Sequence, residues 1–178
     1  MRRFIRSLSD EYIAISDGGI YENVIALPEY QNAKSVLLYY STGREPYTRS
    51  LIKRSLADGK ITALPVSYPH GVMVARRIES LELSEDMYGI PAPSEDCPEI
   101  KKWDIDLIIV PGVTFARNGY RLGQGGGYYD RYLSDYTGNT VGLVRCETLL
   151  DKVPKRKYDL AVKCIVSESG VIRPEPAK

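Results

Sequence analysis

Short apolar runs rich in β-branched and aromatic residues recur along this chain and predict strands. Between the runs, apolar positions follow the three- and four-residue spacing of helices. The expected strands cover residues 35–40, 60–65, 72–76, 105–110, 140–144 and 160–166. Such an alternation of strands and helices predicts a three-layer α/β fold, with a mainly parallel sheet covered by helices on both faces.

Helix boundaries are marked by capping and terminating residues. A loosely helical segment covers 9–27, although Gly18 and Gly19 weaken its middle. A second helix is expected with Thr48 as its N-cap and Gly59 as its stop. A third helix is predicted after a run of glycines, where apolar positions between residues 129 and 136 fall at i, i+3, i+4 and i+7.

The segment 84–100 is acidic and proline-rich, and strands are expected on both sides of it. It therefore predicts a long ordered loop rather than a linker between domains. The length of 178 residues suits one domain with a sizeable core, so we expect a single domain over 1–178.

Composition narrows the classes of protein further. A net charge of +1 gives no general attraction to nucleic acid or membrane. No apolar run approaches the roughly 20 residues of a membrane span, and the N-terminus lacks the apolar core of a signal peptide. Cys97, Cys146 and Cys164 are odd in number and widely spaced, which indicates reduced thiols rather than a disulfide framework. We therefore expect a cytoplasmic protein, either a monomer or a homodimer.

The stretch from Pro111 to Asp130 carries the strongest chemical signal. Four of its glycines, at 123, 125, 126 and 127, lie between an expected buried strand and an expected helix N-terminus. Backbone N–H groups can converge there, and a helix N-terminus favours negative charge, so the stretch predicts a phosphate site. Arg121 offers a cation to phosphate oxygens, and Asp130 offers a carboxylate to a metal.

A second interpretation of this stretch is a plain connection between strand and helix. The string matches neither of the common glycine-rich phosphate-binding motifs. In that case Asp130 would only favour the helix dipole.

The complete string is more specific than its glycines. It contains Pro111-Gly112, and then Arg-Leu-Gly-x-Gly-x-Gly-Tyr-Tyr-Asp from Arg121 to Asp130. This resembles the signature of the 5-formyltetrahydrofolate cyclo-ligases, also called 5,10-methenyltetrahydrofolate synthetases. Further similarities run over essentially the whole chain, including Leu8-Ser9 near the start and Val153-Pro154 near the end.

The resemblance implies a Rossmann-like fold of the NagB/RpiA/CoA-transferase type. It also implies ATP-dependent cyclisation of 5-formyltetrahydrofolate to 5,10-methenyltetrahydrofolate, with ATP and Mg²⁺ as cofactors and a reduced folate as substrate. In that reaction the formyl oxygen attacks the γ-phosphate, and N10 captures the resulting imidoyl phosphate.

Site residues follow from the resemblance position by position. Catalysis is expected from Glu45, Arg121 and Tyr128. Folate contacts are expected from Tyr39, Glu45, Tyr88 and Tyr129, and a metal contact from Asp130. Contacts to ATP are expected from Arg2, Arg6, Arg121, Gly123, Gln124, Gly125, Gly126, Gly127, Tyr128 and Asp130.

Several positions depart from the family pattern. Ala116, Thr148 and Tyr158 stand where an aspartate, a glutamine and a histidine are usual. Counting back from Leu8-Ser9, a lysine and an arginine that hold ATP phosphates in the family would lie before Met1. Arg2 and Arg6 are the candidates to replace them, because residues four apart share a helix face. The alternative interpretation, which the pattern of charges favours, is a basic helix start exposed to solvent.

These departures leave two functions open. The first is the ATP-dependent enzyme. The second is a diverged, non-catalytic paralogue that binds a nucleotide or a folate-like ligand. A nucleotide-binding partner of another protein is a third class, and no specific residue supports it.

Overall fold

Eight strands form one central sheet in this computed structural model, which describes residues 1–175. From edge to edge the order is β12-β11-β10-β7-β1-β2-β3-β6. The bounds are β1 Ser35–Leu37, β2 Ile61–Tyr68, β3 Val72–Ile78, β6 Glu99–Ile100, β7 Leu107–Val110, β10 Asn139–Leu143, β11 Cys164–Ser167 and β12 Gly170–Ile172.

Strands β11, β10, β7, β1 and β2 pair in parallel. Antiparallel strands complete both edges, β12 beside β11 at one edge and β3 with β6 beside β2 at the other. The mainly parallel sheet predicted from the sequence is therefore confirmed. Residues 176–178 of the expected domain lie outside the described residues.

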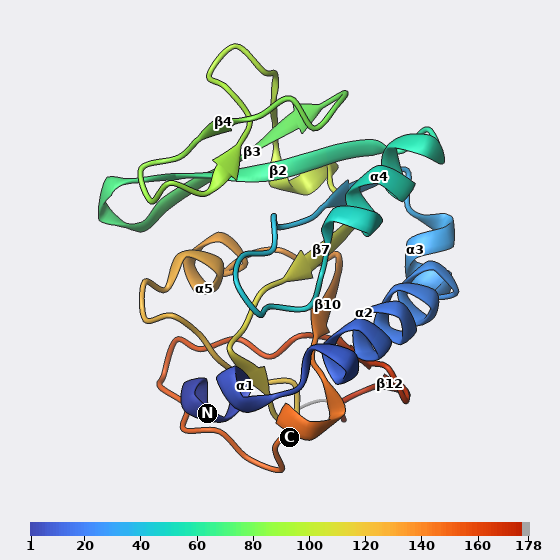
Figure 1. Cartoon of the computed structure of the whole chain (residues 1–178). Coiled ribbons are helices and arrows are strands. Elements are labelled where there is room, and N and C mark those ends of the chain that lie inside the picture. The colour runs from blue at the N-terminus through green and yellow to red at the C-terminus, as the bar shows by residue number, and fades with distance from the viewer. Residues whose placement is uncertain (176–178) are drawn as a thin grey trace.

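Helices cover both faces of the sheet, as the sequence predicts. Figure 1 shows α2, α3 and α4 on one side and α5 on the other. The bounds are α1 Arg2–Ser7, α2 Asp10–Ile25, α3 Pro28–Asn32, α4 Arg49–Ala57 and α5 Tyr128–Tyr132. No helix within residues 1–175 combines the length and the apolar character needed to cross a membrane.

Successive strand residues face two separate cores. In β7, Leu107 and Ile109 pack with α2, α3 and α4, whereas Ile108 and Val110 pack on the face of α5. All four side chains are fully buried. A central parallel strand is covered on both sides, which explains why this segment is apolar without interruption.

Helix α2 has a side-chain cap at its start and a close contact in its middle. Ser9 Oγ accepts a hydrogen bond from the backbone N–H of Tyr12 at 3.1 Å. The glycine pair does not interrupt the helix. A Cβ added at Gly19 would lie 2.8 Å from Cβ of Glu168, so the glycine allows α2 to pack closely on the turn after β11.

The first strand is shorter than predicted, because the chain leaves the sheet after Leu37. Beyond it, Ser41 donates its backbone N–H to Thr48 Oγ1 at 3.0 Å, and Thr48 Oγ1 donates to the carbonyl of Tyr39. Thr48 is the N-cap of α4 by position, as predicted, but its hydroxyl bonds this loop instead of the helix N–H groups.

Two further elements differ from the prediction. Helix α5 ends at Tyr132, although Leu133 and Tyr136 still pack on the expected core. The last parallel strand starts at Cys164 rather than at 160, because the backbone N–H of Leu160 donates to the Asp130 carboxylate in α5 and that of Val162 donates to the carbonyl of Gly119. Short antiparallel pairs lie outside the main sheet, at β4 Ser84–Glu85 with β5 Pro91–Ala92 and at β8 Thr114–Phe115 with β9 Arg121–Leu122.

Candidate functional site

A pocket of about 470 Å³ opens at the carboxyl ends of β1, β7 and β10. Strand β1 is followed in the chain by β2 on one side, while β7 lies on its other side. The loops that leave β1 and β7 therefore diverge. Such a switch point in an open α/β sheet is where ligands bind.

Two loops contribute to the pocket wall, together with the end of β10 and the segment that follows it. The Glu45 loop, residues 41–48, follows β1 and contributes Thr42 to Pro46. The glycine loop, residues 123–127, contributes Gln124. The expected positions of Glu45 and of the glycine loop beyond strand ends are thus found on one pocket.

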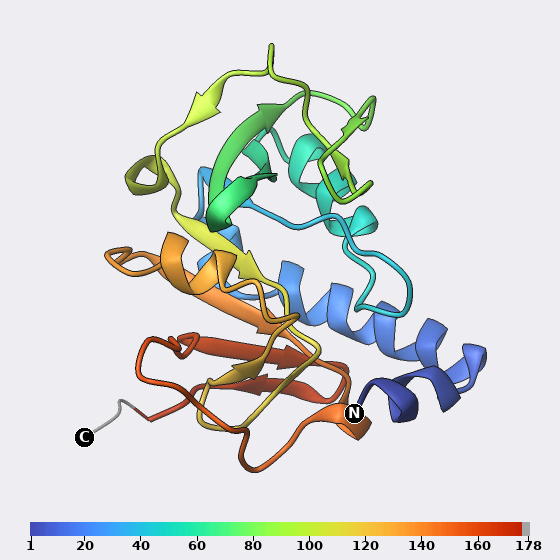
Figure 2. The same ribbon diagram turned by 90° about the vertical axis from the view of Figure 1, so that its left-hand side faces the viewer.

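Helix α1 lies along a third side of this pocket. Its residues Arg2, Ile5 and Arg6 belong to the lining. Arg2 also donates a hydrogen bond to Oε1 of Gln124 in the glycine loop. In Figures 1 and 2, α1 lies beside the orange segment that follows β10. The two arginines named as candidates for ATP therefore both line the pocket, and Arg2 also contacts its glycine loop.

The carboxylate of Glu45 is held by its own loop. Its Oε2 accepts hydrogen bonds from the backbone N–H of Thr42 at 2.8 Å and from Thr42 Oγ1 at 3.2 Å. Burial raises the pKa of Glu45, and the two bonds from Thr42 act in the opposite direction. The structure thus keeps a carboxyl group with a raised pKa at the pocket wall.

Two tyrosines expected to contact folate lie near Glu45. Tyr39 is 5% exposed, and its hydroxyl lies 3.4 Å from the carbonyl of Pro46. Burial raises the pKa of both Tyr39 and Tyr129, and the negative charge of Glu45 raises both pKa values further. The hydroxyl of Tyr129 is buried and has no partner among the described residues. An orphaned buried hydroxyl requires a partner, and a polar atom of a ligand would supply one.

Tyr88 and Tyr128, two further residues expected at the site, contact each other. Their hydroxyl oxygens lie 2.7 Å apart, and their rings meet edge to face with centroids 6.1 Å apart. Tyr128 also donates to the carbonyl of Tyr68 at 3.0 Å. The long loop between β3 and β7 is thereby joined to the start of α5, one residue from Tyr129.

The glycine loop presents an unused set of backbone donors. Within residues 1–175, none of the N–H groups from Gly123 to Gly127 donates to a protein acceptor. Gly125 and Gly127 have φ of +97° and +65°, values that residues other than glycine rarely adopt. Free N–H groups on left-handed glycine backbone suit an anion such as phosphate.

Arg121 and Asp130 are paired with each other. Arg121 Nη2 lies 2.9 Å from Asp130 Oδ1, and the arginine side chain is 6% exposed. Arg121 Nη1 donates to the carbonyl of Leu160 at 3.1 Å, and Asp130 Oδ1 accepts from the Leu160 N–H at 3.1 Å. The roles expected of these two residues towards ATP and metal stay predictions.

The described residues hold no group of three or more histidine, cysteine or acidic side chains that would bind a metal without help. Mg²⁺ at a nucleotide site usually takes one or two carboxylates together with phosphates and water, so a single aspartate fits that chemistry. Oδ2 of Asp130 accepts no hydrogen bond from the described residues and is the oxygen available for this purpose.

Arg145, which the sequence analysis did not single out, is the most connected side chain of the pocket. It is 3% exposed. It donates to Ser16 Oγ at 2.9 Å, to Asp17 Oδ1 at 2.6 Å, and to the carbonyls of Arg44 and Glu45 at 2.8 and 3.3 Å. The signal that could have found it is its position directly after the strand predicted over 140–144.

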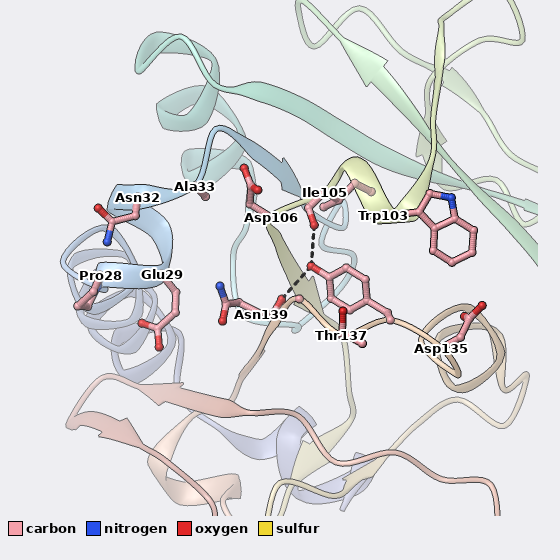
Figure 3. Close-up of a pocket in the computed structure, with 12 residues that line it drawn as sticks. Pro28, Glu29, Asn32, Ala33, Trp103, Ile105, Asp106, Asp135, Thr137 and Asn139 are labelled. Carbon is pink, nitrogen blue, oxygen red and sulfur yellow. Dashed lines mark hydrogen bonds between the residues drawn. The ribbon is translucent and has the colours of Figure 1, made fainter.

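A larger pocket, of about 600 Å³, lies at the opposite, amino end of the strands (Figure 3). Its three carboxylates already have protein partners: Glu29 binds Arg173, Asp135 binds Lys102, and Asp106 accepts from the backbone at the start of β1. None of the expected site residues lines it. The volume of a pocket alone therefore does not identify the functional site.

Fold and site together define an α/β protein with a ligand crevice at the switch point of a mainly parallel sheet. The family model of the 5-formyltetrahydrofolate cyclo-ligases matches residues 2–168. The chain belongs to the 5-formyltetrahydrofolate cyclo-ligase family.

Individual relatives agree with this assignment. A probable 5-formyltetrahydrofolate cyclo-ligase of Schizosaccharomyces pombe is 37% identical, over 93% of this chain and 90% of the relative. The 5-formyltetrahydrofolate cyclo-ligase of Saccharomyces cerevisiae is 30% identical, over 97% and 93%. The solved structure of Aquifex aeolicus 5,10-methenyltetrahydrofolate synthetase superposes with a TM-score of 0.84 at 29% identity, over 99% of this chain and 90% of that one.

Proposed function

We propose that this chain closes 5-formyltetrahydrofolate to 5,10-methenyltetrahydrofolate at the expense of ATP, with release of ADP and phosphate. Membership of the cyclo-ligase family over residues 2–168 carries this proposal. Glu45 on the pocket wall supports it, with Tyr39 and Tyr129 buried near Glu45 although neither lines the pocket, since a flat ring with polar edges suits aromatic side chains and a carboxyl group.

In this proposal each of the two loops binds one of the two ligands. The glycine loop, with Arg2 and Arg6 of α1 nearby, receives the phosphates of ATP. The Glu45 loop orients the reduced folate. Phosphoryl transfer depends on positioning and on neutralising charge, so free backbone N–H groups and cations are the required groups.

Asp130 is proposed as the carboxylate that holds Mg²⁺ with the nucleotide, which would shield the phosphate charge when bound. Asp130→Asn should weaken MgATP binding more than binding of ATP without metal. An equal loss in both titrations would instead assign Asp130 to the ion pair with Arg121 alone.

Turnover tests the proposal directly. Purified protein is mixed with MgATP and 5-formyltetrahydrofolate, and the methenyl product is followed by its absorbance. We expect product from the natural chain and strongly reduced turnover in Glu45→Gln, with ATP affinity retained in that variant. Absence of product, with both ligands shown to bind by calorimetry, would contradict the enzymatic proposal.

A non-catalytic paralogue is the second candidate, and one observation favours it. The Arg121 side chain is 6% exposed and already binds Asp130 and the carbonyl of Leu160. Binding of nucleotide and folate without turnover would identify this function. The cytoplasmic location and the monomeric or homodimeric state stay predictions from the sequence.

A further inference from the structure

Arg49, the first residue of α4, is held between two aromatic rings. Its guanidinium carbon lies 4.5 Å from the centre of the Tyr40 ring and 5.6 Å from that of Tyr47. Stacking of this kind fixes the plane of a guanidinium and leaves its N–H edges for hydrogen bonding.

Those edges have no protein acceptor. Nε of Arg49 is buried and unpartnered, and neither terminal nitrogen donates to any of residues 1–175. In contrast, Arg44, Arg54, Arg121 and Arg145 each form an ion pair. A partly buried, immobilised arginine without an anion is unusual, because charged groups removed from water are normally paired.

Arg49 does not line the pocket itself but lies at the end of the Glu45 loop, which forms part of the pocket wall, and its stacking partner Tyr47 belongs to that loop. It lies four residues after Glu45, and Tyr40 follows Tyr39 directly. The Thr48 side chain does not cap the helix that Arg49 begins, so the helix N-terminus adds to the positive potential there. The Glu45 loop, coloured cyan in Figure 1, leads directly into α4.

We propose that Arg49 is a carboxylate-binding subsite for the glutamate tail of the reduced folate. This inference rests on the proposed function. Folate glutamate carries carboxylates that are ionised at neutral pH, and a planar guanidinium binds a carboxylate through two parallel hydrogen bonds. A phosphate of ATP is the less suitable anion, because the proposed phosphate donors lie in the glycine loop, beyond β7 rather than β1.

Two substrates, one with and one without the glutamate, distinguish carboxylate binding by Arg49 from a purely structural role. We compare 5-formyltetrahydrofolate with 5-formyltetrahydropteroate, which keeps the ring system and lacks the glutamate. The natural chain is compared with Arg49→Ala, Arg49→Lys and the control Lys53→Ala, an exposed cation one turn further along α4. KM and kcat are measured at saturating MgATP, and dissociation constants of both folates are measured by calorimetry.

Arg49→Ala should raise KM and the dissociation constant for 5-formyltetrahydrofolate on the order of tenfold to a hundredfold, with kcat nearly unchanged. The values for the pteroate and the KM for MgATP should stay the same. Arg49→Lys should fall in between, because it keeps the charge and loses the planar fork. Lys53→Ala should behave like the natural chain.

Equal losses with both folates, or a loss confined to MgATP, would overturn the subsite. Should Arg49→Ala fail to fold, the ratio of the two substrates in Arg49→Lys decides in the same way. If the natural chain binds both folates but turns over neither, the proposed reaction fails, while the titrations still decide the role of Arg49.

Discussion

The two loops that flank the switch point differ in how the protein holds them. The Glu45 loop is held by hydrogen bonds between Thr48 and Ser41 within it, and by Arg145 from the segment after β10. The glycine loop makes few contacts of its own: Gln124 meets Arg2, and the carbonyl of Gly126 accepts from Arg131. Its backbone N–H groups are unused within residues 1–175.

This difference suggests that the two ligands are received in different ways. A loop held by buried hydrogen bonds is preorganised, so binding to it costs little ordering. A loop with free donors has its hydrogen bonds completed by the ligand. We therefore expect the folate side to depend on protein contacts far from the ligand, and the phosphate side to depend on the conformations that glycine allows.

The largest effect is expected from removing the connection that holds the Glu45 loop. Arg145→Ala leaves the half-buried Asp17 without its ion pair and should lower the free energy of unfolding by about 3–5 kcal/mol. Urea unfolding measures this. Arg117→Ala is the matched control, since it breaks an exposed pair with Asp151 and should cost less than about 1 kcal/mol. Equal costs would show that the Glu45 loop does not depend on Arg145.

On the other loop, Gly125→Val should abolish nucleotide binding while leaving the circular dichroism spectrum nearly unchanged. The substitution forces a β-branched residue into a φ of +97°. Gly123→Ala is the control, because its backbone is not left-handed and an added Cβ there meets nothing within 4 Å. Normal ATP affinity in Gly125→Val would identify the loop as a plain connection.

A smaller effect is expected from the cations of α1. The double variant Arg2→Ala/Arg6→Ala should weaken ATP binding by about tenfold, because exposed charge contacts are screened by salt. Titration of MgATP by calorimetry at low and high salt measures it, and the difference should shrink as salt rises. Unchanged affinity would make the two arginines a solvated helix start.

The smallest effect concerns the pH dependence of stability on the folate side. Burial raises the pKa of Glu45 above its ordinary value of 4.5, so its neutral form is favoured in the folded state. Its contribution to stability is therefore present below that value and is lost as pH rises through the folded pKa. The unfolding free energy of Glu45→Gln relative to the natural chain should accordingly increase with pH. If the difference in unfolding free energy between the two proteins stayed constant as pH rises from below 4.5, the raised pKa of Glu45 would be contradicted.

Local patterns predicted the elements well where a buried strand or a cap determines them. The uninterrupted apolar run at 105–110 contains β7, and Ser9 caps α2. The local patterns failed where a side chain outside the strand binds the backbone. Tyr39 and Ser41 form hydrogen bonds with Thr48 instead of extending β1.

The site was predicted in the same uneven way. Glu45 and the glycine loop carry a motif or a strand-end position, and the structure places them on one pocket. The pairing of Arg121 with Asp130 was not predicted, since a separation of nine residues gives no sign of which side chains meet. Arg145 was missed because its partners at 16–17 and 44–45 are defined only by the folded sheet.

The contacts of Arg145 also bear on the order in which the molecule is completed. Its hydrogen bonds reach across 128 residues to Asp17 and across 100 residues to Glu45. Contacts between segments so distant in sequence form late, because closing the intervening chain costs entropy before the contact repays it. During synthesis from the N-terminus, the Glu45 loop cannot reach its final conformation until β10 has joined the sheet and Arg145, two residues beyond it, is in place. The binding site is thus assembled from segments far apart in the chain, and its completion requires the sheet to have formed as far as β10.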